Sequence, residues 1–255
     1  KQLVLTDFKL RYQGSALGYL WSLLRPLALF IILYFVFAKL LKIGDTVPNF
    51  PVYLLVGIVV WNYFAEVTNS SITSVVSKGD LLRKINFPRY VIVLAGSFSA
   101  LINLFLNSII IIIFMIFTGV ELQASIVLLP LLIIELFILS LAISFFLSAA
   151  FVRFRDINYI WEVIMQGAFY ATPILYPLTL VTSQSELIAK IMMLNPMAQI
   201  IQDIRNVLVT PAAQTIGDIY GTGLARLIPI AMIMIVVLVS VIYFRSRSKY
   251  FAEEV

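Results

Sequence analysis

Long apolar runs alternate with short polar segments along the whole chain. A helix that crosses a bilayer needs about 20 mostly apolar residues, because each residue adds about 1.5 Å and the hydrocarbon layer is about 30 Å thick. The runs that approach or exceed that length are residues 26–42, 52–73, 90–118, 125–152, 159–176 and 222–244. The pattern predicts an all-α membrane protein with six transmembrane helices in a single domain over residues 1–255.

The composition favours a lipid environment over water. Of the 255 residues, 62% are hydrophobic and 12% are charged, whereas soluble domains are about 25% charged. The chain has no Cys and no His, which argues against disulfides, against Cys or His metal sites, and against Ser-His or Cys-His nucleophiles. We therefore expect neither a catalytic residue nor a metal site.

Basic residues indicate the orientation of the spans, because Lys and Arg concentrate in cytoplasmic loops. If both termini are cytoplasmic, 13 basic residues fall on that side and 5 on the opposite side. This asymmetry predicts cytoplasmic termini. It also accounts for the net charge of +5 without a nucleic-acid partner.

The N-terminal segment, residues 1–25, alternates charged and bulky apolar positions. Tyr12 and Trp21 can share one face while Lys9 lies on another. This pattern predicts an amphipathic helix in the cytoplasmic interface, which turns into the first span at Arg25-Pro26.

A second polar segment, residues 77–89, lies between two strong spans on the cytoplasmic side. Asp80 can cap a short helix, and Pro88 favours an extended Phe87 that ends it. With Leu81 and Leu82 exposed, such a helix would suit the groove of a partner protein. An ordinary solvated loop is an equally good interpretation.

Residues 177–223 are too apolar for an aqueous loop and too interrupted to span the bilayer. Short apolar runs are broken at Asn195-Pro196 and closed at Pro211. Such runs predict re-entrant or interfacial helices on the extracytoplasmic side. Pro173 and Pro177 break the preceding span, which creates either a substrate exit or a simple kink.

Three acidic residues fall inside predicted spans, where a charge is costly and often functional. Glu135 is the deepest, and we expect Asn103 and Asn107 on the preceding span to hydrogen-bond it as structural contacts rather than as a proton relay. Glu66 and Glu162 lie nearer the span ends, where they can reach an interface.

The remaining candidate chemistry is binding. No Gly is followed by Lys, so the chain has no P-loop for a nucleotide. Aromatic residues are frequent, and rings with phenol hydroxyls suit a pathway for sugars, although packing explains most of them equally well. The pathway candidates are Tyr34, Phe37, Trp61, Tyr63, Phe169 and Tyr170.

Five groups of residues, in this order, carry a resemblance to a known family. They are Arg11-Tyr12 with Ser15, Leu17-Gly18, Trp21 and Pro26; Gly79-Asp80-Leu81-Leu82-Arg83-Lys84 with Phe87-Pro88; Phe154-Arg155-Asp156-Ile157; Pro173 with Tyr176-Pro177; and Leu194-Asn195-Pro196-Met197 with Arg205. The chain resembles the permease subunit of polysaccharide-exporting ABC transporters, which move lipid-linked O-antigen or teichoic acid across the bacterial inner membrane.

The resemblance implies that the chain works in a complex with other subunits. Two copies of the permease would form the channel, and two separate ATPase subunits would bind ATP and Mg and drive it. The ATPase-coupling helix would contain Gly79, Asp80, Leu81, Leu82, Arg83, Lys84, Phe87 and Pro88. The substrate would be a lipid-linked glycan in contact with membrane lipid, and the chain would not be an enzyme by itself.

The resemblance also implies two ends of a transport pathway. Arg side chains bind phosphates well. Arg11, Arg25 and Arg89 are therefore candidates to bind a lipid-linked head group at the cytoplasmic entrance. The re-entrant exit gate would contain Pro173, Tyr176, Pro177, Asn195 and Pro196.

Two other functions fit the composition. One is an ABC exporter of drugs or small lipids, for which a narrow aliphatic pathway would be expected. The other is a proton-coupled carrier acting alone, which predicts internal repeats; we find no convincing repeat of the first three spans in the last three.

Overall fold

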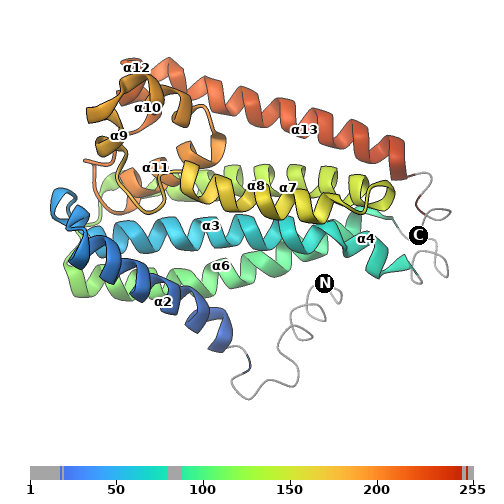
Figure 1. Cartoon of the computed structure of the whole chain (residues 1–255), viewed down its shortest axis with the longest axis horizontal. Helices are drawn as coiled ribbons and strands as arrows, with labels where there is room; N and C mark the ends of the chain where they lie inside the picture. Colours follow the sequence, from blue (N-terminus) through green and yellow to red (C-terminus); the bar gives the residue numbers. More distant parts are fainter. Residues whose placement is uncertain (1–17, 19, 80–87, 249–250, 252–255) are drawn as a thin grey trace.

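The computed structural model describes residues 18, 20–79, 88–248 and 251, and this part of the chain consists of helices and turns without a strand (Figure 1). Five helical segments among these residues are long and apolar enough to cross a membrane: Leu20–Leu40, Phe50–Ile72, Tyr90–Thr118, Ala124–Arg153 and Gly223–Ser248. The protein is therefore a multi-pass, all-helical membrane protein.

The bundle is built from long helices that run in alternating directions (Figure 1). These are α2 (Leu20–Tyr34, continued by a π-helix, Phe35–Leu40), α3 (Phe50–Ile72), α6 (Tyr90–Thr118), α7 (Leu129–Arg153), α8 (Ile157–Ala171) and α13 (Leu227–Ser248). Short 3₁₀ segments, Ala124–Leu128 and Gly223–Arg226, lead into α7 and α13, and a short α4 (Ser74–Ser77) follows α3.

Helix α3 forms the centre of the bundle. It packs against α2, α6, α7, α8 and α11, while α13 packs on the outer side against α7. Val52, Leu55, Val56 and Ile58 of α3 are fully buried. Helices α2 and α13 instead leave most of their apolar side chains exposed, as expected where lipid is the solvent.

The predicted fifth span is shorter than its apolar run. Helix α8 has 15 residues, about 22 Å at 1.5 Å per residue, and is followed by turns over residues 172–177. Pro173 and Pro177 cannot supply helical N–H groups, so the helix ends at Ala171. Five of the six predicted spans are present as continuous helices, and the break predicted at Pro173 is confirmed; that α8 belongs to a sixth span stays a prediction.

The first span also differs from its prediction. Helix α2 begins at Leu20 and runs through Pro26, so the predicted turn at Arg25-Pro26 is wrong. Pro26 lacks the N–H that would bond the Ser22 carbonyl four residues earlier. Asn107 of α6 donates to that carbonyl instead, with an Nδ2–O distance of 3.2 Å. The predicted interface helix otherwise lies outside the described residues.

Four short helices form a cap at the end of the bundle opposite α4 and the end of α13 (Figure 1). They are α9 (Leu178–Gln184), α10 (Glu186–Met193), α11 (Pro196–Leu208) and α12 (Ile216–Tyr220). The cap has an apolar core of its own around Leu178, Met193 and Ile216. The predicted broken helical segment is therefore present; its re-entrant position in the membrane stays a prediction.

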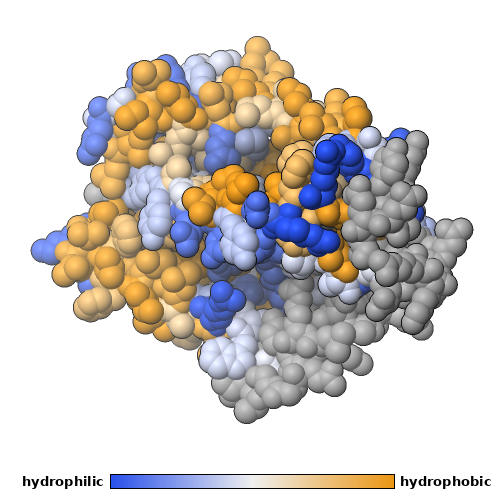
Figure 2. Space-filling view, turned by 45° about the vertical axis from the view of Figure 1, so that its right-hand side comes forward, coloured by the Kyte–Doolittle hydropathy of each residue, from blue (hydrophilic) through white to orange (hydrophobic). Residues whose placement is uncertain are grey.

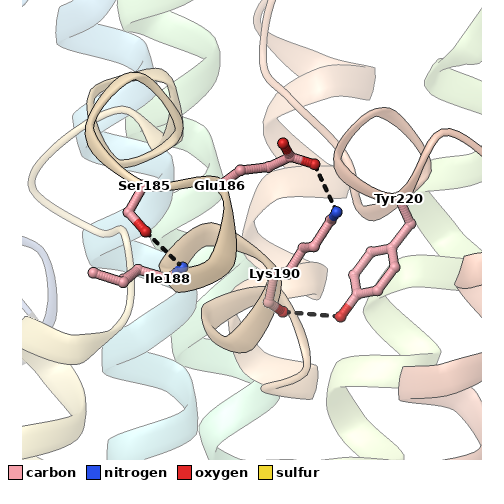
Figure 3. Close-up of polar contacts among 5 residues, drawn as sticks. All are labelled: Ser185, Glu186, Ile188, Lys190 and Tyr220. Carbon is pink, nitrogen blue, oxygen red and sulfur yellow. Dashed lines mark hydrogen bonds and ion pairs between the residues drawn. The ribbon is translucent and has the colours of Figure 1, made fainter.

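Polar contacts fix the outer helices of the cap (Figure 3). The Ser185 hydroxyl accepts from the Ile188 N–H at 3.4 Å and caps α10. Lys190 Nζ lies 2.6 Å from the Glu186 carboxylate, and the Tyr220 hydroxyl donates to the Lys190 carbonyl at 3.1 Å. The first two contacts lie within α10, and the contact from Tyr220 joins α12 to α10.

Candidate functional site

A cleft of about 850 Å³ opens between α2, α3 and α6. Its lining residues come from most of α2, from the middle and second half of α3 and from the middle of α6, so the cleft extends from the middle of the bundle toward the end that carries α4. Its lining residues are Trp21, Ser22, Arg25, Pro26, Leu29, Ile32, Val59, Asn62, Tyr63, Ala65, Glu66, Asn69, Ser70, Asn103, Leu104 and Asn107. We call this the polar cleft.

The floor of the polar cleft is a hydrogen-bonded chain of side chains. Asn103 Nδ2 donates to Glu66 Oε1 at 2.7 Å, and Asn107 Nδ2 donates to the Asn103 carbonyl at 2.8 Å. Within the part of the chain that the structure describes, three buried oxygens in this region have no hydrogen-bond partner: Tyr63 Oη, Asn103 Oδ1 and Asn107 Oδ1. Buried polar atoms are normally paired, so the floor has hydrogen-bonding capacity left for a ligand or water.

The mouth of the polar cleft is exposed and charged. Arg25 and Trp21 of α2 are exposed, as is Asn69 of α3. Figure 2 brings forward the end of the bundle that carries α4, and there hydrophilic residues gather between hydrophobic flanks. A guanidinium at the mouth and a carboxylate with several amides inside can hold a polar ligand by hydrogen bonds.

Among the described residues, no group of three or more Asp, Glu, His or Cys could hold a metal ion. The side chains that line the polar cleft can bind a ligand by charge and by hydrogen bonds.

The prediction for the intramembrane acids is wrong for Glu135. The amides of Asn103 and Asn107 point to α3 and α2 rather than to α7. Glu135 instead faces α11, where the Gln199 side chain hydrogen-bonds it and Asp203 lies nearby. Glu66 also differs from expectation, because it lies in the polar cleft rather than reaching for an interface.

A second buried polar cluster joins the cap to the centre of the bundle. Arg205 of α11 is fully buried. Its Nε donates to the Tyr53 carbonyl at 2.9 Å, and its two terminal nitrogens donate to the carbonyls of Pro173 at 2.5 Å and Ile174 at 2.6 Å. We call Arg205 with Tyr53, Gln202, Pro173 and Ile174 the Arg205 clamp.

The clamp compensates the buried charge without a carboxylate. The guanidinium carbon lies 3.7 Å from the centre of the Tyr53 ring, an attractive cation–π geometry. Gln202 Oε1 accepts from both Arg205 Nη1 at 3.2 Å and the Tyr53 hydroxyl at 3.0 Å. Gly57 leaves the space, because a Cβ there would collide with Arg205 Nη2. The clamp thereby ties the chain break after α8 to α3 and α11.

The structure brings the predicted exit-gate residues together at this break. Asn195 caps α11 by accepting from the Met197 N–H at 3.0 Å, and its Nδ2 lies 3.4 Å from Thr172 Oγ1. Pro196 follows at the first helical position, and the Tyr176 hydroxyl donates to the Tyr170 carbonyl at 2.8 Å. Pro173 and Pro177 are buried beside them.

Sequence reasoning missed the role of Arg205 at this break. The available signal was a single Arg on a short apolar helix, directly after Gln199 and Gln202.

The predicted pathway aromatics fall into three groups instead of one. Tyr63 lines the polar cleft. Trp61 contacts Phe169 on the α8 side of α3, with ring centres 5.8 Å apart, and Phe169 contacts Tyr170 at 5.3 Å. Tyr34 stacks on Phe30 of α2 at 5.7 Å, and Phe37 is half-buried in the π-helix.

The basic entrance and the coupling segment are described only in part. Arg25 lines the mouth of the polar cleft, and Arg89 is half-buried directly before α6. Gly79 is buried and Pro88 is exposed. The other predicted residues, Arg11 and those at positions 80–87, lie outside the described residues.

Comparison with known proteins gives a consistent result. The profile of the ABC-2 type transporter family matches residues 1–209. The chain is similar to a protein of Myxococcus xanthus named O-antigen export system permease protein RfbA, with 31% identity over 78% of this chain and 75% of that protein. It is also similar to a Klebsiella pneumoniae protein of the same name, with 30% identity over 86% of this chain and 83% of that protein.

Proposed function

The chain belongs to the ABC-2 type transporter family, and from that membership we propose that it is the channel-forming permease subunit of an exporter of lipid-linked polysaccharide. The relatives named O-antigen export permease favour O-antigen over teichoic acid as the polymer class. The observation that carries the proposal is the polar cleft, which provides hydrogen-bonding groups inside an apolar bundle. A transported polar chain needs such groups where it leaves water.

The proposed assembly contains two copies of this chain and two ATPase subunits. ATP and Mg would bind to the ATPases, in keeping with the absence of a Gly-Lys pair from this sequence. The segment from Gly79 to Pro88 would contact the ATPase and transmit its motion to α3 and α6, which flank it in the chain. Neither a drug exporter nor a proton-coupled carrier has an observation of its own in favour.

The proposed location is the bacterial inner membrane, with both termini cytoplasmic. Helices α2, α6 and α8 run opposite to α3, α7 and α13 (Figure 1), so α8 with residues 172–177 would complete a sixth crossing. The polar cleft then lies on the cytoplasmic half, where Arg25 would meet the diphosphate of the substrate. The cap and the break at Pro173 would lie at the extracytoplasmic exit.

The test is reconstitution of the full chain with candidate ATPase subunits in lipid vesicles, followed by measurements of native mass, ATP hydrolysis and export of lipid-linked O-antigen. We expect a complex of two permeases and two ATPases that hydrolyses ATP and exports the glycan. A permease that retains no ATPase and exports nothing would contradict the proposal.

A matched pair of variants tests the coupling segment within that experiment. Leu82→Asp should abolish ATPase retention or coupled export, because it places a charge in a proposed apolar contact. Leu122→Asp makes the same change at an exposed loop residue on the proposed extracytoplasmic side, and should leave coupling unchanged. Equal activity of both variants would remove residues 79–88 from the ATPase contact.

A further inference from the structure

The polar cleft has a donor and acceptor set that matches a sugar better than a simple ion. Asn62, Asn69 and Ser70 line it beside the Glu66 carboxylate, and Trp21 offers an indole ring at the mouth. Amides donate and accept, whereas a carboxylate accepts only. Such a mixture satisfies ring hydroxyls, which also both donate and accept.

The unpaired side-chain oxygens support a ligand-binding role for the polar cleft. Tyr63, Asn103 and Asn107 are 3%, 5% and 7% exposed, and each has a buried side-chain oxygen with no hydrogen-bond partner among the described residues. All three residues line the polar cleft. Unsatisfied buried oxygens are costly, and a ligand rich in hydroxyls would provide donors for them.

The polar cleft also adjoins an apolar space. A cavity of about 110 Å³ lies between α3, α6, α7 and α11, and Val59 and Leu104 line both spaces. A ligand with a polar head and an apolar tail would find both environments in contact. Arg25, the one cation among the described residues that line the polar cleft, can bind the phosphate of such a ligand.

We propose that the polar cleft binds the phosphate-linked sugar nearest the lipid, with Arg25 on the phosphate and Glu66, Asn62 and Asn69 on the sugar hydroxyls. This inference rests on the proposed function and makes the site a selector for the first sugar of the substrate. A phospholipid with an ethanolamine head would use Arg25 and Glu66 but leave the amides without a role. The set of side chains therefore favours the sugar.

The experiment measures binding of three probes to the purified full chain in nanodiscs by native mass spectrometry. The probes are a polyprenyl diphosphate carrying one N-acetylhexosamine, the same polyprenyl diphosphate without sugar, and phosphatidylethanolamine. We expect the sugar-bearing probe to bind about tenfold more tightly than the bare diphosphate, as expected for one or two additional hydrogen bonds.

Variants separate the sugar contacts from the phosphate contact. Glu66→Gln keeps an oxygen for Asn103 but removes a charged acceptor, and Asn69→Ala changes an exposed residue that folding does not need. Both should abolish the tenfold preference between the two diphosphate probes. Arg25→Gln should weaken both diphosphate probes. Glu121→Gln, in the exposed loop after α6, is the matched control and should behave as the wild type.

Three results would overturn the inference: equal wild-type binding of the two diphosphate probes, a preference that survives in both Glu66→Gln and Asn69→Ala, or displacement of the sugar-bearing probe by equimolar phosphatidylethanolamine. The proposed function has its own readout, which is coupled ATP hydrolysis and export. Sugar preference without export would contradict the function but support the site, while export with no sugar preference would do the reverse.

Discussion

The Arg205 clamp and the polar cleft are two buried polar clusters that flank the same central helix, and they differ in how completely their atoms are paired. Three of the nitrogens of Arg205 donate to backbone carbonyls. In the polar cleft, the side-chain oxygens of Tyr63, Asn103 and Asn107 have no hydrogen-bond partner among the described residues. The guanidinium group of the clamp has hydrogen-bond partners within the protein, whereas the polar cleft is open at one side.

The difference separates a structural network from a binding surface. A buried network in which every group is paired makes the fold rigid. Loss of any one member leaves its partners unpaired in a low-dielectric interior. In an incompletely paired network next to an open volume, a ligand that pairs the remaining groups binds with a favourable free energy. The clamp should therefore govern stability, and the cleft should govern ligand binding with little effect on stability.

The largest expected effect comes from Arg205→Ala. It would leave the carbonyls of Tyr53, Pro173 and Ile174 without their donor and would open a cavity in a fully buried place, so we expect a loss of about 3–5 kcal/mol in stability. The measurements are thermal unfolding in detergent and the fraction of monodisperse protein. Arg245→Ala, exposed near the end of α13, is the control, and equal melting of the two variants would show that the clamp is dispensable.

The next effect is expected from Gly57→Ala, which enters the clamp from α3. The added Cβ would collide with Arg205 Nη2 and lie 3.2 Å from the Ile174 carbonyl oxygen, so we expect a cost of about 1–3 kcal/mol from overpacking. Gly96→Ala on α6 meets nothing within 4 Å and should be neutral or stabilising, because Ala favours helix more than Gly. A lower melting temperature for Gly96→Ala than for Gly57→Ala would contradict this account.

The long helices of this fold could be predicted from the sequence, because every span must be apolar and long enough to cross the lipid bilayer. Apolar length alone predicted α3, α6, α7 and α13 to within a few residues. The turn at Pro26 failed because the rule for proline assumes that the freed carbonyl stays unpaired, and Asn107 supplies the missing donor from another helix. A local sequence pattern cannot show that a distant segment supplies the missing hydrogen-bond donor.

The candidate site was less predictable because it depends on which side each polar residue faces. Glu66 and the two asparagines were recognised as unusual, but spacing could not show that Asn103 pairs with Glu66 rather than with Glu135. The spans α3 and α7 are both neighbours of α6 in the sequence, and α6 packs more closely against α3. Arg25 was predicted as part of a substrate entrance from its position alone, and it lines the mouth of the polar cleft.

A smaller effect on stability is expected when one amide of the polar cleft becomes apolar. Asn103→Leu keeps the volume and removes an oxygen that has no partner, while the open cleft lets water reach Glu66. We expect a loss below about 1 kcal/mol together with weaker binding of the sugar-bearing probe. The matched variant Gln202→Leu removes a fully buried acceptor of two hydrogen bonds in the clamp and should cost about 2–3 kcal/mol. Equal losses would erase the distinction between the two clusters.

The smallest effect is expected outside both clusters, at the exposed pair on α10. The hydrogen bond from Lys190 and its positive charge lower the pKa of Glu186. A carboxyl group with a lowered folded-state pKa stabilises the protein above its ordinary value of about 4.3, and that contribution is lost as the pH falls through the lowered pKa. Since both side chains are exposed, water and salt screen the pair strongly.

Glu186→Gln should therefore melt almost as the wild type does at pH 7 in physiological salt. At low salt the wild type should be slightly more stable at pH 7, and the difference should shrink and vanish as the pH falls through the lowered pKa, below which the folded carboxyl is protonated as well. Glu121→Gln, measured in parallel, corrects for the general effect of removing one negative charge. A difference that grows on acidification would contradict the sign of the shift, and a large difference at pH 7 would mean that the cap depends on its surface pair as the bundle is expected to depend on the clamp.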